Sequence, residues 1–290
     1  MSPQIDKLVV IGVGLIGGSF ALALKQADAV GRVVGIGRSA GNIQKALALG
    51  AIDEASENPG AVKGAQLVLV AVPVGQMEPV LRAISPHLDD RTIVTDAGST
   101  KRDVVRHAID ALGPAIERFV PGHPIAGAEH SGIDAASGSL FRGRKVILTP
   151  LAQNGAEAVS VVERAWPACG AAVQRMEPQR HDEVFAAVSH LPHLLAYALV
   201  DEIADHANAG QLFDQAASGF RDFTRIASSH PEMWRDVCIA NRDALLGELA
   251  LFEAQLARLR GMLESGNAQA LEEVFARARA ARNRWIASKE

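Results

Sequence analysis

Residues 8–19 read LVVIGVGLIGGS, a short apolar run that ends in closely spaced glycines. The glycines follow the spacing G-x-G-x-x-G, directly after a predicted strand and at the start of a predicted helix. In this pattern the first glycine makes a tight turn, the second lets a pyrophosphate approach the backbone, and the third lets helix and strand pack closely. The spacing alone is weak evidence, but the strand and helix patterns around it favour a dinucleotide-binding unit. The predicted cofactor-binding residues of this loop are Gly12, Gly14, Leu15, Ile16 and Gly17.

The rest of the first half alternates strand patterns with helix patterns. Nearly continuous apolar runs predict buried strands at 8–12, 32–37, 66–73 and 92–98. Helical spacing lies between them at 15–27, 40–49, 76–84 and 101–112. Weaker strands at 118–122, 145–150 and 171–176, and a helix at 154–168, follow. This alternation predicts an α/β domain over residues 1–177, with the doubly wound parallel sheet of the Rossmann-like folds.

Strand patterns stop after Met176, and residues 178–290 predict an all-α domain. Its expected helices span 180–208, 211–226, 230–264 and 268–287. Ser229 and Glu232 form an S-x-x-E capping box, and Gly266 is a C-cap glycine after the long helix. Residues 237–259 are apolar on more than one helical face. Two readings stay open, burial against a partner subunit or a central position in the helical domain.

Composition excludes several classes of protein. The chain has 290 residues, 48% of them hydrophobic and 21% charged, and a net charge of −4. These values predict a globular protein without a nucleic-acid groove or a basic membrane face. No run approaches the roughly 18 apolar residues that a spanning helix needs, and no signal-peptide pattern opens the sequence. Cys169 and Cys238 are far apart, which is typical of free thiols in a reducing compartment, so we expect a cytoplasmic protein.

The end of the second strand indicates which dinucleotide is bound. Enzymes that use NAD usually carry Asp or Glu there to bind the ribose hydroxyls, whereas this chain has Arg38 and Ser39. The nearest acids, Asp28 and Asp53, are not positioned for the ribose. The sequence therefore favours NADP, with NAD as the alternative, although Arg38 also fits a solvated surface arginine. The predicted cofactor-binding set is completed by Val72 and Pro73.

Two polar residues follow neighbouring strands of the predicted sheet. Ser99, in DAGSTK, ends the fourth long strand and is expected to face the nicotinamide, to cap the next helix, or both. His123, in GHPIAG, follows the next strand, and Pro124 favours an extended backbone there. An imidazole at this edge can take a proton from a substrate hydroxyl while hydride leaves. The alternative for His123 is an ordinary solvent-facing loop histidine.

Two motifs of the helical half carry polar residues. His190 and His193 are spaced H-x-x-H without further acids, so we predict no metal site. Arg221 and Arg225 lie four residues apart with Asp222 between them. This group is either a surface ion-pair patch or a guanidinium fork for a carboxylate substrate.

Six segments, in this order, resemble one family. They are GVGLIGGS, AVPV, DAGSTK, GHPIAGAEHSG, SHLPHLLAYAL and GFRDFTRIA, and they run over nearly the whole chain. Together they resemble the prephenate/arogenate (cyclohexadienyl) dehydrogenases of tyrosine biosynthesis. The resemblance implies an N-terminal dinucleotide domain, a helical domain that makes a homodimer, and an active site between the two. It also implies NAD(P)-dependent oxidative decarboxylation of prephenate, arogenate or both, giving 4-hydroxyphenylpyruvate, tyrosine or both.

The resemblance also implies roles for individual residues. His123 matches the catalytic histidine that hydrogen-bonds the ring C4 hydroxyl, and Ser99 matches the serine that orients this hydroxyl and the nicotinamide. The implied substrate-binding residues are Arg225, which binds a carboxylate, Glu129, which pairs with that arginine, His193 and Trp234. Many members have aspartate near Gly37, where this chain has none.

Two other functions are weighed against this one. A β-hydroxyacid dehydrogenase has a similar layout but usually carries a catalytic lysine on a helix of its second domain, and no lysine occurs between Arg180 and Arg284. An NADP-sensing protein without catalysis is the second alternative. The presence of Ser99, His123 and Arg225 together argues against it.

Overall fold

The first βαβ unit begins at the N-terminus of the sheet. In the computed structural model, which describes residues 4–127 and 132–288, β1 (Ile5–Ile11) leads through the glycine turn into α1 (Leu15–Gln26) and then β2 (Val30–Ile36). β1 and β2 pair in parallel, from Ile5 opposite Val30 to Ile11 opposite Ile36. The predicted strand–glycine turn–helix arrangement is confirmed.

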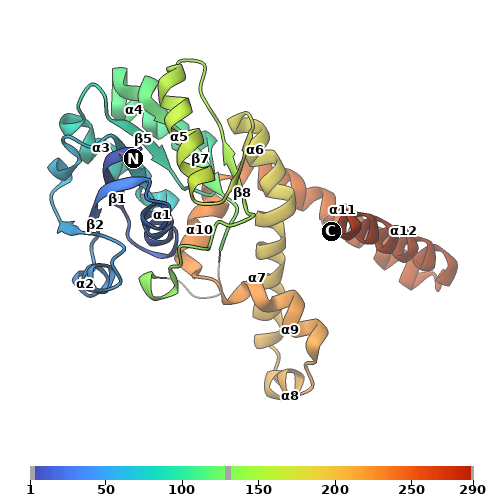
Figure 1. Ribbon diagram of the computed structural model, residues 1–290. Coiled ribbons are helices and arrows are strands. Elements are labelled where there is room, and N and C mark those ends of the chain that lie inside the picture. The colour runs from blue at the N-terminus through green and yellow to red at the C-terminus, as the bar shows by residue number, and fades with distance from the viewer. Residues whose placement is uncertain (1–3, 128–131, 289–290) are drawn as a thin grey trace. The chain divides into compact units, whose positions relative to one another are not determined.

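The six strands of the main sheet are parallel, in the order β3-β2-β1-β4-β5-β6. Figure 1 labels β1, β2 and β5 of this sheet. The further strands are β3 (Glu54–Ser56), β4 (Leu67–Val70), β5 (Ile93–Asp96) and β6 (Phe119–Val120). The helices between and after them are α2 (Ala40–Ala48), α3 (Met77–Ile84), α4 (Arg102–Leu112) and α5 (Ala156–Ala168). This is the strand order of the dinucleotide-binding folds, so the predicted doubly wound sheet is confirmed.

Helices cover both faces of this sheet, which explains the continuous apolar strand sequences. Leu8 and Val10 of β1 pack in the core that contains α1 and α5, together with Phe20 and Trp166. Their neighbours Val9 and Ile11 point to the opposite core, formed with α3 and α4. Alternate residues of one strand thus enter two separate cores. Both faces of the strand are therefore apolar, and its sequence does not alternate between apolar and polar residues.

The predicted strand 118–122 is wrong as a single element. β6 ends at Val120, and β7 (Gly122–Pro124) begins a second sheet with β8 (Lys145–Leu148) and β9 (Ala172–Arg175). β7 and β8 are antiparallel, while β8 and β9 are parallel. Pro121, between β6 and β7, has no N–H to donate, although its carbonyl accepts a hydrogen bond from the Thr149 N–H at 2.9 Å. His123 therefore lies within a strand, and not in a loop after one.

The predicted helix 180–208 contains a local distortion. α6 (Pro178–Phe185) widens into a π-helical turn (Ala186–His190) and continues as α7 (Leu191–Ala204). Pro192 has no N–H, so a regular α-helix would leave the carbonyl of Val188 without a donor. The wider turn lies directly before the proline, where a π-bulge relieves this mismatch.

Two other predicted helices are divided. The range 211–226 forms α8 (Ala209–Asp214), α9 (Ser218–Thr224) and a 3₁₀ turn (Arg225–Ser228). The range 230–264 forms α10 (Pro231–Ala240) and α11 (Arg242–Glu264), because Asn241 leaves helical geometry at φ −105° and ψ 27°.

The predicted ends of the helices have mixed outcomes. The Ser229–Glu232 capping box is wrong, since His230 precedes α10 and makes no side-chain cap. Gly266 has φ +61°, and its N–H bonds the carbonyl of Leu263 while that of Asn267 bonds Met262. These two bonds close the predicted C-cap before α12 (Ala268–Ala287).

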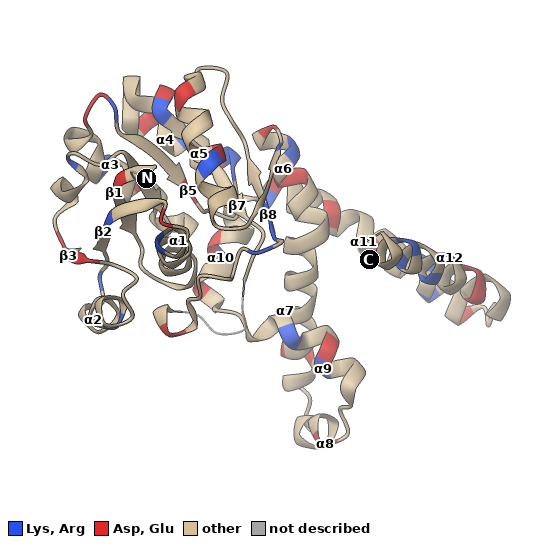
Figure 2. Ribbon diagram, viewed as in Figure 1, with Lys and Arg blue, Asp and Glu red and all other residues tan. Residues whose placement is uncertain are grey.

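The chain divides into two compact units between Arg242 and Asp243. The first unit contains both sheets and α6 to α10, and the predicted domain boundary at 177/178 falls between β9 and α6. The second unit consists of most of α11 together with α12, and several of its large apolar side chains are exposed, namely Leu246, Leu251, Leu256, Leu263, Phe275 and Trp285. Acidic and basic residues are mixed along α12, as they are over α4, α5 and α6 (Figure 2).

One helical stretch, Pro178–Ala204, is long and apolar enough to cross a membrane by length and composition alone, contrary to the prediction from the sequence. This is weak evidence for a membrane span, because a core helix of a soluble protein passes the same test. The stretch also buries His181, Asp182 and His190 inside the first unit.

Candidate active site

The three fingerprint glycines are required for three different reasons. Gly12 has φ +95°, and a Cβ there would lie 2.4 Å from the carbonyl oxygen of Ala71. A Cβ on Gly17 would lie 2.3 Å from the carbonyl oxygen of Gly12, so this glycine allows α1 to pack on the turn. A Cβ on Gly14 would meet no atom within 4 Å. The open side of the turn is thus at Gly14, where the fingerprint predicts the pyrophosphate.

Asn42 supports the fingerprint turn, although no sequence pattern indicated this role. Its side-chain amide donates to the carbonyl of Val13 at 2.6 Å, and its Oδ1 accepts from the Ile133 N–H at 3.3 Å. Asn42 therefore connects the turn to a segment about 90 residues further along the chain. A polar residue in the first turn of a helix is too common to indicate such a contact.

The other predicted cofactor-binding residues follow β1, β2 or β4, which are neighbouring strands of the parallel sheet. Leu15 and Ile16 begin α1, and Val72 and Pro73 directly follow β4. Arg38 is exposed after β2, and the Ser39 hydroxyl accepts from the Asn42 N–H at 3.3 Å and caps α2.

A buried ion pair fixes the start of β7. Lys101 and Asp96 are both fully buried, and Lys101 Nζ lies 2.5 Å from Asp96 Oδ2. Lys101 also donates to the carbonyl of Gly122 at 2.7 Å, and Asp96 Oδ1 accepts from the Gly122 N–H at 3.0 Å. Burial raises the pKa of Asp96, and the charge of Lys101 opposes this rise. Both backbone polar groups of the residue before His123 are therefore held by one ion pair.

His123 is the first member of a chain of three polar side chains. Its Nδ1 lies 2.8 Å from Nε2 of His181, and Nδ1 of His181 lies 2.8 Å from Oδ1 of Asp182. The Asp182 carboxylate also accepts from the N–H groups of Lys101 at 2.8 Å and Arg102 at 2.9 Å. Asp182 thus binds the N-terminus of α4 from a helix 80 residues away, where the helix dipole favours an anion.

Burial controls the protonation of this chain. It lowers the pKa of His123 well below the usual 6.5, and the neighbouring His181 and Lys101 act in the same direction. Burial also lowers the pKa of His181, although its bond to Asp182 opposes this. For Asp182, burial acts to raise the pKa, but the hydrogen bonds from His181 and Arg102 lower it overall. Near neutral pH both imidazoles are therefore neutral and the carboxylate is ionised.

A second aromatic and polar cluster lies on α7 and α10. The rings of His193 and Trp234 stack with their centroids 3.5 Å apart at 19°, and His193 Nδ1 lies 2.9 Å from the Ser189 carbonyl oxygen. Burial lowers the pKa of His193, the Ser189 bond opposes this, and the charge of Arg225 lowers it further. Burial lowers the pKa of His190 to about 4. Within residues 4–127 and 132–288, Nε2 of His190 and Nε1 of Trp234 have no hydrogen-bond partner.

The other predicted polar residues have mixed outcomes. Ser99 is half-buried between β5 and α4, but Lys101 occupies the N-cap position of α4, so the capping role is wrong. Arg225 begins the 3₁₀ turn after α9, close enough to His193 to affect its pKa. Arg221 is exposed and lies 4.0 Å from Asp222, as the surface ion-pair reading predicts. Glu129 lies outside the described residues, and the described part of the chain holds no metal-binding group of three His, Cys, Asp or Glu.

Comparison with known proteins assigns both halves of the chain. Residues 20–175 match the model of the prephenate dehydrogenase nucleotide-binding domain, and residues 177–277 match that of the prephenate dehydrogenase dimerization domain. The chain belongs to the prephenate dehydrogenase family. The resemblance inferred from the six sequence segments is confirmed, and the β-hydroxyacid dehydrogenase alternative is excluded. The chain is an oxidoreductase of this family.

Its relatives extend over nearly its full length. It is 37% identical to the prephenate dehydrogenase of Bacillus subtilis over 95% of this chain and 75% of that protein. It is 36% identical to the cyclohexadienyl dehydrogenase of Zymomonas mobilis over 95% of this chain and 94% of that protein. The Aquifex aeolicus prephenate dehydrogenase, solved with hydroxyphenyl propionate and NAD+, has a TM-score of 0.91 at 35% identity over 97% of this chain and 99% of that one. The Synechocystis arogenate dehydrogenase has a TM-score of 0.80 at 27% identity, over 96% of this chain and 99% of that one.

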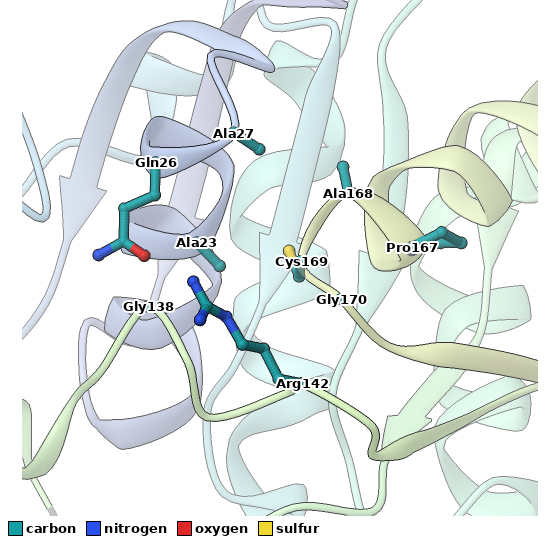
Figure 3. Close-up of a pocket in the computed structure, with 9 residues that line it drawn as sticks. All are labelled: Ala23, Gln26, Ala27, Gly138, Arg142, Pro167, Ala168, Cys169 and Gly170. Atoms are coloured by element: carbon teal, nitrogen blue, oxygen red, sulfur yellow. The ribbon is translucent and has the colours of Figure 1, made fainter.

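A further pocket of this prephenate dehydrogenase family member lies away from the fingerprint turn. Figure 3 shows this pocket of about 170 Å³, in which Arg142 and Gln26 lie close together. It is formed where α1 and α5 end, and burial raises the pKa of the Cys169 thiol in its wall to about 12. An un-ionised thiol is a poor nucleophile, and none of the predicted site residues lines the pocket. Its lining residues are Ala23, Gln26, Ala27, Gly138, Arg142, Pro167, Ala168, Cys169 and Gly170.

Proposed function

We propose that this chain catalyses the oxidative decarboxylation of prephenate, arogenate or both. Family membership supports this reaction class, and the protonation state of His123 carries the proposal. His123 is half-buried and its pKa is well below 6.5, so it is a neutral imidazole at physiological pH. A neutral imidazole can accept a proton, which the oxidation of a ring alcohol requires.

In the proposed reaction the substrate loses a hydride from ring C4 and a proton from the C4 hydroxyl. When bound, the nicotinamide cofactor accepts the hydride. His123 takes the hydroxyl proton, and Ser99, after the neighbouring strand β5, orients the hydroxyl. The ring carboxylate leaves as carbon dioxide, and its bonding electrons make the ring aromatic. The C4 oxygen then takes the proton back from His123, which gives the phenol hydroxyl of 4-hydroxyphenylpyruvate or tyrosine.

The proposed substrate-binding residues are Arg225, His193, Trp234 and Glu129. Arg225 would bind a carboxylate, because a guanidinium forms two parallel hydrogen bonds to that group. His193, whose ring is stacked on that of Trp234, would contact the ring of the substrate.

NADP is the proposed cofactor. The proposal rests on Arg38, which is exposed after β2 and can reach a 2′-phosphate, and on the lack of an acid at this strand end. Asp53 is not available to a ribose, because its carboxylate pairs with Lys25 at 2.5 Å and accepts from the Val33 N–H at 2.7 Å. The Arg38→Gln variant should lower kcat/KM for NADP more than for NAD, whereas Arg91→Gln, at another exposed arginine, should change neither. A wild-type kcat/KM for NAD equal to or above that for NADP contradicts this proposal.

The proposed assembly is a homodimer formed through the helical half. The large apolar side chains exposed on α11 and α12 support it, because exposed apolar patches often mark an interface. A sedimentation experiment that shows only monomers at assay concentration would exclude the dimer. A cytoplasmic location is also proposed, on the basis of the two unpaired cysteines.

The central experiment measures initial rates for both substrates with both cofactors and identifies the product. His123→Asn should lower kcat by about 10²- to 10⁴-fold with little change in the substrate KM, since a general base contributes about that much. His87→Asn is the matched control, because His87 is exposed and lies after α3. Near-normal turnover of the His123 variant would refute the assigned base. Turnover of neither substrate by the wild type would favour the NADP-sensing alternative.

A further inference from the structure

We propose that His181 and Asp182 are positioning residues that fix the tautomer of His123, so that its Nε2 carries the lone pair that accepts the substrate proton. This inference rests on the proposed function of His123 as the base. Its evidence is the unbroken series of contacts from Asp182 Oδ1 to His181 Nδ1 and from His181 Nε2 to His123 Nδ1, each at 2.8 Å. All three side chains are described residues of the first compact unit.

The direction of the hydrogen bonds follows from Asp182. Its carboxylate accepts the N–H groups of Lys101 and Arg102, so it is ionised and has no proton to donate. The contact between Oδ1 and Nδ1 of His181 therefore requires the proton on Nδ1. In a neutral imidazole the other nitrogen then presents a lone pair. His181 Nε2 is thus an acceptor, and it faces His123.

The second contact sets His123 in the same way. Its Nδ1 must carry the proton in order to donate to His181 Nε2, which leaves Nε2 of His123 unprotonated. No hydrogen bond joins this Nε2 to any residue that the structure describes, so it is available to a substrate hydroxyl. Without the contacts to His181 and Asp182, the proton of a neutral His123 would be distributed over both ring nitrogens. Part of the enzyme would then present an N–H group to the substrate.

The groups around His181 keep it neutral. A protonated His181 would donate from Nε2 to His123 and so reverse the direction of that hydrogen bond. The titratable groups that influence the pKa of His181 are Asp182, Asp96 and Lys101. Burial and Lys101 lower that pKa against the two carboxylates, and Asp96 is already paired with Lys101. His190, another buried neighbour, is also neutral near pH 7, since its pKa is about 4. His181 therefore remains neutral and passes on the orientation imposed by Asp182.

The same contacts also stabilise His123 after it has accepted a proton. After it accepts the substrate proton, the imidazolium keeps its Nδ1–H bond to His181, with the Asp182 charge at the far end. The ring of Phe185 lies 4.9 Å from that of His123 and 4.5 Å from that of His181, centroid to centroid, and limits rotation of both. A fixed ring meets the geometric requirement for proton transfer better than a rotating one.

The direct test is the imidazole ¹⁵N spectrum of the full-length protein labelled with [¹⁵N]histidine, recorded at pH 8. Long-range proton–nitrogen correlations distinguish Nδ1–H from Nε2–H, and the His123→Gln and His181→Gln variants assign the two rings. We expect Nδ1–H for both rings, and an average of the two tautomers for exposed His87. A proton on Nε2 of His123 in the wild type overturns the proposal.

Kinetics provide the second readout. His181→Gln places a carbonyl oxygen near the original Nε2, where it can still accept from His123, so kcat should stay within about 10-fold of wild type. His181→Leu removes the acceptor and should lower kcat by about 10² or more at nearly unchanged KM. Equal kcat values for the two variants overturn the proposal. Normal turnover by His123→Asn would instead refute the base itself, whichever tautomer the spectrum shows.

Discussion

Breaking the buried ion pair of Lys101 and Asp96 should strongly lower the free energy of unfolding. Replacing Lys101 by Met keeps the length of the side chain and removes its charge and both of its hydrogen bonds. The carboxylate of Asp96 then stays fully buried, and its remaining partners among the described residues are the N–H groups of Gly98 and Gly122. Removing one partner of a buried ion pair typically destabilises a protein by about 3–5 kcal/mol. We expect a loss of that order at pH 8.

The loss should decrease as the pH falls. Burial already raises the pKa of Asp96 above that of an aspartate in the unfolded chain, and removing Lys101 raises it further. A group with a raised pKa in the folded state stabilises that state at low pH, and this contribution disappears as the pH rises through the folded pKa. In the Lys101→Met variant, Asp96 can therefore take up a proton at pH 5.5 and relieve part of the penalty that is complete at pH 8.

Urea unfolding followed by circular dichroism, at pH 5.5 and pH 8, measures both effects. Lys63→Met is the matched control, because Lys63 is exposed, and it should change the free energy of unfolding by no more than about 0.5 kcal/mol. The reasoning is refuted if Lys101→Met costs less than about 1 kcal/mol, or if its cost is the same at the two pH values. If the Lys101→Met variant folds, it should also lose turnover, because the ion pair of Lys101 and Asp96 holds the backbone of Gly122, the residue before His123.

Three further predictions concern the cofactor turn, the substrate and pH. Gly17→Ala should lower Tm, since its Cβ would lie 2.3 Å from a backbone oxygen, whereas Gly14→Ala should keep Tm and raise the cofactor KM because its Cβ points into open space. Arg225→Ala should lower kcat/KM by a factor equivalent to about 2–5 kcal/mol, mainly through the substrate KM, while Arg221→Ala, at a surface arginine 4.0 Å from Asp222, should be nearly silent. Because the pKa of His123 is lowered, kcat/KM should persist as the pH falls past 6.5 and decline only below it. A decline centred at or above 6.5 would contradict this last prediction.

The dinucleotide half could be read from the sequence because its signals are local. A glycine turn, the strand before it and the helix after it lie within some 30 residues, and every strand buried on both faces is marked by its apolar run. The predictions of helices were wrong where tertiary contacts override the local sequence pattern. Asn241 interrupts a sequence with strong helical character, and its side-chain amide donates to the Asp182 carbonyl at 2.8 Å and contacts His190 at 3.0 Å. No spacing rule reveals such a break.

The same limit explains why the sequence pointed to His123, the proposed base, and gave no sign of the two residues that contact it through hydrogen bonds. His123 stands in a conspicuous motif between glycines, whereas His181 and Asp182 are two ordinary polar residues at the start of an amphipathic helix. Their role arises from distance in the fold, since Asp182 reaches backbone N–H groups 80 and 81 residues before it and His181 reaches a ring 58 residues before it. A lone acid beside a histidine in a helix usually faces solvent, so the sequence favours the wrong interpretation of this pair. Burial reverses it, because two fully buried polar side chains must satisfy their hydrogen bonds with fixed partners, and here those partners include the imidazole of His123.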